Sequence, residues 1–397
     1  MPEMNRPLES EVDVAIIGAG ILGAGVAQAA AAAGHRVRLF ERTAPAAGTS
    51  SRSSKLIHGG LRYLETGQFR LVREALRERQ WLLKNAPGLV HPLRFFVPIY
   101  RDTRRRPSAL ALGLLLYRLL GGGPGSGRIS PRHWHNPDGL DTRNLQAVFT
   151  YLDAQTDDAA LTRTVLRSAQ ALGAELHCPA EVESIEKRPD GYSVISTCGG
   201  QRRETHCATL VNTAGPWVNR VLDRITAPAL ELNLELPVDL VQGAHLVLAG
   251  RLAAGAYYVE AADRRAVFIL PWQAGTTLVG TTETPFHGDP DTVHPLPEEI
   301  AYLLDTVKRH FPRRSLSLQS TFAGLRVLPR GTGSAFGRAR ETLFATDGGR
   351  PPRLVSVCGG KLTTWRVTAE KVLHLLAPAL PARSRRVDTH YLRLEPI

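Results

Sequence analysis

The chain contains little cysteine, little lysine and no long apolar run, and each absence narrows the class of protein. Only four of its 397 residues are cysteines, and none is spaced as a C-x-x-C pair, so we expect neither a disulfide framework nor a metal site. No apolar run reaches the roughly 18 residues of a membrane-spanning helix. The first residues also lack the apolar stretch of a signal peptide. These absences predict a cytoplasmic protein.

Positive charge is in excess. The formal net charge is +12, and nearly all of the excess comes from arginine because the chain has only six lysines. Such an excess can attract nucleic acids, anionic membranes or anionic substrates. Because the sequence carries no signature of a nucleic-acid-binding module, we expect no nucleic-acid partner.

A glycine-rich turn follows the first apolar segment. Residues 12–17 (VDVAII) are typical of a buried parallel strand. GAGILG comes next, with Gly18, Gly20 and Gly23, and an alanine-rich helical stretch then leads to a second strand that ends at Glu41. In such a βαβ unit the glycines allow a tight turn and close approach of a pyrophosphate, while the acid accepts the ribose hydroxyls. The pattern predicts a dinucleotide site, without choosing between FAD and NAD.

The segment after Glu41 favours FAD. In an NAD-binding domain further βα units would usually follow, whereas this chain continues with a loop rich in serine and glycine, AAGTSSRSSKLIHGG. Its hydroxyls and backbone N–H groups suit the ribitol, the pyrophosphate and the edge of the flavin ring. We therefore expect this loop to wrap a flavin nucleotide.

The stretch SSRSSKLIHGGLRYLE resembles the signature of FAD-dependent glycerol-3-phosphate dehydrogenases, the membrane-associated type that reduces quinone. The resemblance continues through FRLVREALRERQWLLKNAP, YLDAQTDDAALT, VNTAGPWVN, QGAHLVL, GTTET, GLRVLP and VCGGKLTTWR, and it spans about residues 11–376. Members of that family usually carry an additional helical domain after the last of these motifs. Since this chain continues for only about thirty residues beyond it, we expect a short form without that domain.

The resemblance implies an α/β fold with added antiparallel β structure, as in the wider group of D-amino-acid oxidase. We expect a discontinuous Rossmann-like FAD-binding domain from residues 11–100, 145–221 and 320–378. An antiparallel substrate domain is expected over 222–319, where the apolar pattern changes to alternation. Residues 101–144 form a separate apolar and basic segment, and 379–397 a C-terminal tail.

Residues 101–144 include a twelve-residue apolar stretch at 109–120, preceded by arginines at 104–106. Twelve residues cannot span a bilayer, but they can lie at its interface with the arginines on anionic headgroups. The alternative is a buried helix with a solvated basic flank. The sequence leaves both open, so the protein is either cytoplasmic or peripheral on the inner face of the cytoplasmic membrane.

The motifs and the resemblance together indicate which residues contact the FAD. Most come from the glycine turn, the serine loop and two later strand-to-loop turns. The expected cofactor residues are Gly18, Gly20, Ile21, Leu22, Gly23, Glu41, Arg42, Thr49, Ser50, Ser51, Ser53, Ser54, Lys55, Leu56, His58, Gly59, Gly60, Val182, Thr213, Ala214, Gly215, Gly324, Gly360, Lys361, Leu362 and Thr363.

Substrate binding is assigned to cations and hydroxyls in the same motifs. Arg62 in GGLRYLE and Arg326 in AGLRVLP match family positions implicated in binding the substrate phosphate, and a planar guanidinium suits that anion. Tyr63 is expected to add a hydroxyl contact. Thr281 and Thr282, in GTTET, are expected to do the same.

Three residues are candidates for the proton and charge chemistry. His245, in QGAHLVL, matches a family histidine and is the expected base. His58 is the competitor, although we favour it as a flavin contact. Lys361 is expected near the flavin or the substrate oxygen, where its ammonium would stabilise developing negative charge. Arg62 and Arg326 complete the expected catalytic set.

The resemblance implies oxidation of sn-glycerol 3-phosphate to dihydroxyacetone phosphate, with hydride transfer from C2 to flavin N5 and electrons passed to quinone or another acceptor. One alternative is an FAD-dependent oxidoreductase that acts on another 2-hydroxy acid or on an amino acid, where one arginine would suffice. A second alternative is a non-catalytic flavin-binding protein. The sequence does not determine the oligomeric state, although a dimer is compatible with it.

Overall fold

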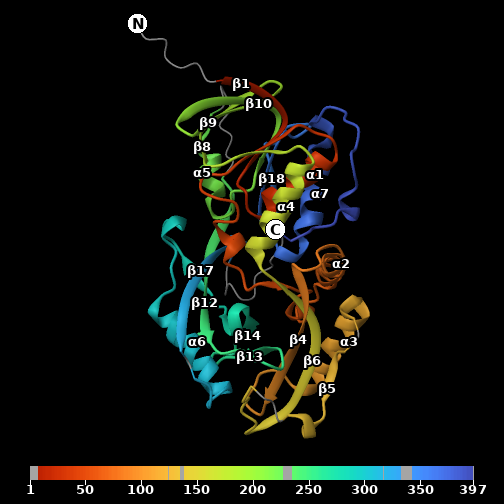
Figure 1. Cartoon of the computed structure of the whole chain (residues 1–397), viewed down its shortest axis with the longest axis vertical. Coiled ribbons are helices and arrows are strands. Elements are labelled where there is room, and N and C mark those ends of the chain that lie inside the picture. Colours follow the sequence, from red (N-terminus) through yellow and green to blue (C-terminus); the bar gives the residue numbers. More distant parts are fainter. Residues whose placement is uncertain are drawn as a thin grey trace.

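The structure is a computed structural model of the chain, and it describes residues 8–123, 125–134, 138–226, 235–315, 317–331 and 342–396. Residues 124, 135–137, 227–234, 316 and 332–341 belong to segments assigned above and lie outside the described residues. Two large sheets lie one above the other in Figure 1 and form the framework of the described chain.

The first sheet has nine strands within the described residues. These are β1 (Leu8–Ile17), β2 (Val37–Phe40), β7 (Glu175–His177), β8 (Ala180–Arg188), β9 (Gly191–Cys198), β10 (Gln201–Asn212), β11 (Ile225–Thr226), β18 (Thr342–Thr346) and β19 (Leu354–Gly359). Strands β7, β2, β1 and β10 lie side by side and parallel, and β19 pairs in parallel with the end of β10. The parallel part of this sheet confirms the Rossmann-like expectation.

Seven α-helices of the described residues pack around the two sheets. They are α1 (Ile21–Ala32), α2 (Phe69–Asn85), α3 (Pro107–Tyr117), α4 (Asp158–Ala171), α5 (Val218–Leu222), α6 (Pro297–His310) and α7 (Trp365–Leu376). Helices α1, α4 and α7 pack together beside the first sheet (Figure 1). The alanines of α1 are buried because this helix has α4 on one side and α7 on the other.

The second sheet has ten strands within the described part of the chain. These are β3 (Leu56–Ile57), β4 (Val90–Tyr100), β5 (Gly127–Ile129), β6 (Leu145–Thr156), β12 (Val238–Ala249), β13 (Ala256–Glu260), β14 (Ala266–Trp272), β15 (Thr276–Gly280), β16 (Thr284–Phe286) and β17 (Leu318–Pro329). Strands β13, β14, β15 and β12 pair antiparallel in succession, which confirms the expected change to antiparallel structure.

Five strands pair elsewhere than the expected domain bounds imply. Two of them are short, since β3 pairs with β6 in the second sheet and β11 with β8 in the first. Strands β4 and β6 were expected with the FAD-binding segments, but they pair with each other, and β4 joins β13 in the second sheet. Strand β17, expected with 320–378, pairs with β12 in the same sheet. Alternation within one strand shows that it has a buried face but not which strand lies beside it. The domain bounds themselves stay a prediction.

Helix α3 has one buried face and one exposed apolar face. Leu110, Leu114 and Tyr117 are buried. On the other side Leu112 is 58% exposed and Leu115 is 53% exposed, and Leu119, just beyond the helix, is 73% exposed. Both sequence alternatives for 109–120 therefore keep support. None of the helices within the described ranges is long and apolar enough to cross a bilayer.

The C-terminal segment after α7 packs back onto the first sheet and its helices. Arg383 forms a bidentate ion pair with the buried Asp13 of β1. The indole N–H of Trp81 donates to the carbonyl of His390, and the Leu394 side chain is fully buried. Residues of the expected tail therefore contribute to the core around α1 and α2.

Candidate active site

A cavity of about 720 Å³ is lined by residues from both sheets. Most residues expected at the cofactor or the substrate line it. Those that do are Gly18, Gly20, Ile21, Leu22, Glu41, Arg42, Thr49, Ser50, Ser53, Ser54, Leu56, His58, Gly60, Arg62, Tyr63, Val182, Thr213, Ala214, Gly215, His245, Thr281, Gly324, Arg326, Gly360, Lys361, Leu362 and Thr363. The fold therefore gathers motifs that are up to about 345 residues apart in the chain.

The glycine turn at the end of β1 forms one part of the wall. Gly18 has φ +99°, and a Cβ there would lie 2.9 Å from the Thr213 carbonyl oxygen. Glu41 follows β2, and its carboxylate accepts the backbone N–H of Ala19 at 2.8 Å. The acid thus lies beside the turn that precedes α1, as the dinucleotide pattern predicts.

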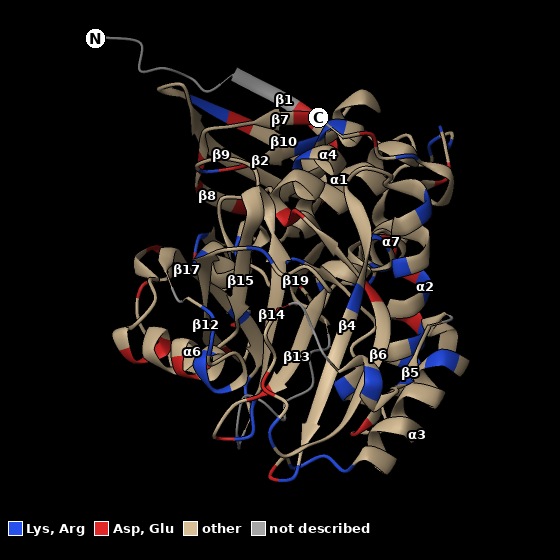
Figure 2. Cartoon of the chain, turned by 60° about the horizontal axis from the view of Figure 1, so that its bottom comes forward, with Lys and Arg blue, Asp and Glu red and all other residues tan. Residues whose placement is uncertain are grey.

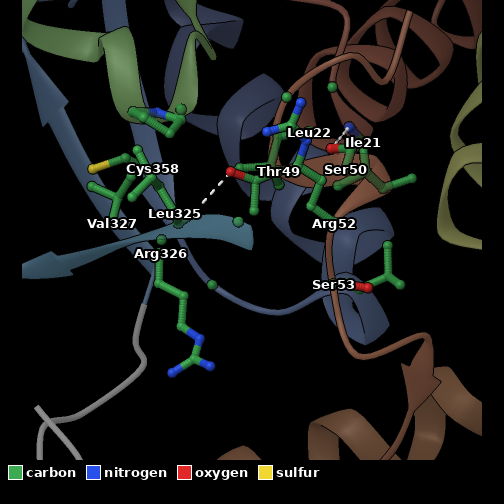
Figure 3. A pocket seen from close by; sticks show the side chains of 18 of the residues that line it. Ile21, Leu22, Thr49, Ser50, Arg52, Ser53, Leu325, Arg326, Val327 and Cys358 are labelled. Atoms are coloured by element: carbon green, nitrogen blue, oxygen red, sulfur yellow. Dashed lines mark hydrogen bonds between the residues drawn. The ribbon is translucent and has the colours of Figure 1, made fainter. Parts of the chain in front are cut away.

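The serine loop binds both to α1 and to β17. The Ser50 hydroxyl accepts the backbone N–H of Ile21 at 2.9 Å, and the Thr49 hydroxyl donates to the Leu325 carbonyl at 2.7 Å (Figure 3). Ile21 begins α1 and Leu325 lies on β17. The loop therefore connects the helix N-terminus of the first sheet with a strand of the second.

A buried ion pair fixes the middle of the same loop. The Lys55 ammonium lies 2.5 Å from an Asp158 oxygen, and both side chains are almost fully buried. The other Asp158 oxygen accepts the Ser53 hydroxyl at 2.6 Å. Removing one partner of such a pair would leave a buried charge without compensation. Lys55 therefore supports the loop from behind the cavity.

Five expected contacts do not line the cavity: Gly23, Ser51, Lys55, Gly59 and Thr282. The Ser51 hydroxyl donates to the Gly48 carbonyl, and that of Thr282 donates to Glu299 at 2.7 Å. Gly23 packs against the glycine turn, and Gly59 donates to a tyrosine behind the loop. Which way each of these residues points depends on packing that the sequence does not display.

Arg326 faces the cavity from β17 (Figure 3), and residues 281–283 hold its guanidinium. One guanidinium nitrogen lies 2.8 Å from a Glu283 oxygen, and another donates to the Thr281 hydroxyl at 2.9 Å. The Glu283 side chain is only 8% exposed, so its charge compensates the arginine away from bulk water. The orientation of this guanidinium is therefore set by the protein.

Two further cations lie around the ring of Tyr63. The Lys361 ammonium is 3.8 Å from the ring centroid, and the Arg62 guanidinium carbon is 5.7 Å from it. Cations over an aromatic face are attracted by its quadrupole. Gly60 has φ +81°, which allows the tight turn into the helical segment that carries Arg62 and Tyr63.

His245 is buried on β12 with its ring stacked on Phe322. Its Nε2 lies 2.9 Å from the Ser54 hydroxyl. Burial, reinforced by the positive charges of Arg326 and Lys55, lowers the pKa of His245 to about 3. The imidazole is therefore neutral at pH 7, in the form that can accept a proton.

Other residues line the cavity without having been expected. Among them are Arg52, Trp217, Tyr258, Phe268 and Glu283. Trp217 follows the Gly215 turn by two residues, so AGPWVN carried a local signal for it. Glu283 lies in GTTET, so that motif carried a local signal for it too. The two aromatic residues on β13 and β14 had none, because only the pairing of the second sheet brings them to the cavity.

Comparison with known proteins identifies the family. The sequence profile of the family described as FAD dependent oxidoreductase, which is named DAO, matches residues 13–366. The chain belongs to this family. The enzyme is 38% identical over 382 residues to D-erythritol 1-phosphate dehydrogenase of Brucella abortus, covering 93% of this chain and 74% of that protein. It is also 38% identical over 382 residues to glycerol-3-phosphate dehydrogenase of Pseudomonas aeruginosa, covering 94% and 73%.

Solved structures agree with this assignment. Glycerol-3-phosphate dehydrogenase from Bacillus halodurans, solved with FAD, matches the enzyme with a TM-score of 0.74 at 27% identity, covering 97% of this chain and 68% of that one. L-α-glycerophosphate oxidase from Mycoplasma pneumoniae, also solved with FAD, has a TM-score of 0.77 at 16% identity and covers 98% and 99%. At that identity the second match supports the fold alone.

The residues present in the enzyme fit FAD. At Gly20 a Cβ would lie 3.0 Å from the Ser50 hydroxyl oxygen, so the wall between the glycine turn and the serine loop has no side chain at that point. The N-terminus of α1 opens there, which favours a pyrophosphate. Glu41 suits the ribose, and the serine loop, Gly360 and Lys361 line the path toward Arg326.

The lowered pKa of His245 leads to a prediction about pH. At saturating substrate, kcat should show no acid limb near the usual histidine value of 6.5, because the imidazole stays neutral down to about pH 3. Rapid-reaction measurement of FAD reduction between pH 5 and 8 checks this. An inflection near pH 6.5 in kcat would contradict the assignment of a neutral His245.

Protein stability offers an independent check of the same shift. Because the folded state disfavours protonated His245, its contribution is fully present above pH 6.5 and declines as the pH falls toward 3. Between pH 7 and pH 4.5 the wild type should therefore lose more unfolding free energy than His245→Gln, which cannot titrate there. Equal losses in urea titrations would contradict the shift.

Proposed function

We propose that the enzyme oxidises sn-glycerol 3-phosphate to dihydroxyacetone phosphate. The observation that carries the proposal is the set of three cations, Arg62, Arg326 and Lys361, on the wall of one cavity that also fits FAD. An alcohol substrate with a dianionic handle needs such a set. The names of the relatives support it, since D-erythritol 1-phosphate and glycerol 3-phosphate are both phosphorylated polyols.

The three cations have different tasks in this proposal. Arg326 is already paired with Glu283, so its charge is largely compensated and a dianion needs further positive charge. Arg62, which lies in GGLRYLE, supplies that additional positive charge. Lys361, over the Tyr63 ring, stabilises the negative charge that develops on the substrate oxygen or at the cofactor.

His245 takes the proton of the substrate hydroxyl. Its imidazole is neutral at pH 7, and Ser54 fixes the ring through a hydrogen bond to Nε2. Burial against Phe322 excludes water from one side of the ring. FAD, when bound, supplies the acceptor for the hydride that leaves the carbon bearing this hydroxyl.

An anaerobic reduction experiment tests the proposal. Purified protein that retains FAD is mixed with sn-glycerol 3-phosphate, and loss of the flavin absorbance is followed in a stopped-flow instrument. We expect full bleaching by sn-glycerol 3-phosphate and none by lactate or glycine, which lack a phosphate. Retained FAD that stays oxidised with sn-glycerol 3-phosphate would overturn the substrate assignment.

D-erythritol 1-phosphate is a second candidate substrate, because one of the two relatives above that match at 38% identity is named for it. It has the same phosphate handle and one more carbon, so the same cations would bind it. Including it in the reduction panel separates the two. The substrate with the larger kcat/KM is the one that the enzyme prefers.

We further propose that the electrons leave to a quinone-type acceptor at a membrane surface. Leu112, Leu115 and Leu119 are spaced on one side of the α3 segment and are more than half exposed. Arg104 and Arg106 are exposed in the loop that runs into α3, which is largely blue in Figure 2. Exposed leucines next to exposed arginines suit the interface of an anionic bilayer.

Replacing Leu112, Leu115 and Leu119 together by glutamate should lower binding to anionic phospholipid vesicles by about 10-fold or more, because three apolar anchors become charged. Co-sedimentation with vesicles measures this. The matched control is the double replacement Leu318→Glu and Tyr391→Glu, which charges exposed apolar side chains elsewhere. Equal vesicle binding by both variants and the wild type would contradict membrane contact through α3.

A further inference from the structure

A buried polar network behind the substrate loop connects α3 to the backbone of Gly59, three residues before Arg62. We define the substrate loop as residues 58–65, which follow β3 and carry Arg62 and Tyr63 into the cavity. Its first residues make hydrogen bonds to two other parts of the chain. The arrangement points to a positioning function that the cavity residues alone do not explain.

The network begins at the backbone of the substrate loop. The Gly59 N–H donates to the Tyr117 hydroxyl at 2.9 Å, and that hydroxyl donates to an Asp153 oxygen at 2.7 Å. Arg79 donates to the same Asp153 oxygen at 2.5 Å and to the Leu152 carbonyl at 2.6 Å. The chain of bonds thus crosses from the loop to α3, β6 and α2.

All members of the network are buried. Tyr117 is 1% exposed, and the Asp153 and Arg79 side chains are 1% and 5% exposed. Arg79 also donates to the Gly122 carbonyl just beyond α3 at 3.0 Å. The Arg79 Nε has no hydrogen-bond partner, but the other bonds of this buried ion pair favour a single geometry, because each alternative would leave a further polar group unpaired.

Packing leaves Gly59 little freedom of its own. A Cβ at Gly59 would lie 2.6 Å from both the Tyr117 hydroxyl and a Leu76 methyl carbon. One residue earlier, the His58 N–H donates to the Thr363 hydroxyl at 3.0 Å. The start of the substrate loop is therefore held between the C-terminal motif on one side and α3 on the other.

From this geometry we propose that Tyr117, oriented by Asp153 and Arg79, is a positioning residue for Arg62. It acts through the Gly59 N–H, three residues before the guanidinium that is proposed to bind the substrate phosphate. Without the hydroxyl, the nearest remaining acceptor for Gly59 is Asp153 at 3.4 Å, which is too long for a strong hydrogen bond. The inference rests on the proposed function of Arg62.

Tyr117→Phe tests the proposal, because it removes the hydroxyl and keeps the buried ring. We expect KM for sn-glycerol 3-phosphate to rise about 5- to 10-fold, with kcat within about 2-fold and FAD content unchanged. Hydrogen exchange of the substrate-loop amides should become faster. The matched control is Tyr100→Phe, which removes the hydroxyl of another buried tyrosine, bonded to the Asp141 carbonyl away from the cavity. It should leave KM and loop exchange unchanged.

The outcomes separate this proposal from the proposed function. A wild type that is not reduced by sn-glycerol 3-phosphate overturns the function and the role of Arg62 with it. A reactive wild type with the same KM in both variants overturns the positioning role alone. Should the Phe variant not fold, the wild type still decides, because loop amides at 58–63 that exchange much faster than those of β6 would contradict a fixed loop.

Discussion

Arg326→Ala should lower kcat/KM for sn-glycerol 3-phosphate by about 1,000-fold or more. Two charge-assisted hydrogen bonds to a phosphate contribute about 4 kcal/mol together, which corresponds to that factor. The variant also leaves the nearly buried Glu283 carboxylate without its guanidinium partner and facing the phosphate. Steady-state kinetics with a dye acceptor measures the loss, and most of it should appear in KM.

Two further variants make this result specific. Arg326→Lys keeps the positive charge but loses the planar fork, so we expect a smaller loss of about 10- to 100-fold. Arg309→Ala removes an arginine from an exposed ion pair with Asp102, at residues that do not line the cavity, and should leave kcat/KM within about 2-fold. If Arg326→Ala behaved like Arg309→Ala, the phosphate-binding role would be wrong.

Gly23→Ala should abolish retention of FAD. A Cβ at Gly23 would lie 1.8 Å from the Gly18 carbonyl oxygen and 2.7 Å from the Thr213 hydroxyl oxygen. These neighbours cannot retreat easily, because the Thr213 hydroxyl also donates to the Ile17 and Gly18 carbonyls. The clash must push α1 away from the turn that its N-terminus completes, and the ratio of flavin to protein absorbance after purification should fall at least about 10-fold.

Gly113→Ala is the matched control for this prediction. Gly113 is also a helical glycine, but an added Cβ would have nothing within 4 Å. That variant should purify with the wild-type flavin content and with equal or slightly higher thermal stability, since alanine favours helix. A Gly23→Ala protein that keeps its flavin would show that the turn tolerates a wider separation than its geometry indicates.

Local patterns were most successful where the chemistry is contiguous in the chain. The strand, glycine turn and acid of the first βαβ unit predicted β1, α1 and β2. Each depends on contacts between residues fewer than about 25 positions apart. Arg62, Lys361 and Arg326 were assigned through the resemblance of their motifs to a known family, before their neighbours were known.

The sequence patterns did not predict contacts between segments that are far apart in the chain. Lys55 lies in the serine loop and was expected at the cofactor, but its ammonium pairs with Asp158, 103 residues later, and Lys55 does not line the cavity. Glu283 was not expected, although it pairs with Arg326 across the second sheet. Strands β4, β6 and β17 belong to that sheet. The alternation of apolar and polar residues within each strand does not show which strand it pairs with.

The amino-acid sequence alone predicted a dinucleotide site at a glycine turn, because that pattern depends on residue types at short spacings, and the resemblance to a known family assigned cations to an anionic substrate. Only the tertiary structure decided which of those residues face the cavity, that His245 is buried and neutral beside Ser54, and that Tyr117 reaches the substrate loop. Burial and hydrogen-bond partners are properties of the packed chain, since they are set by segments that meet only on folding.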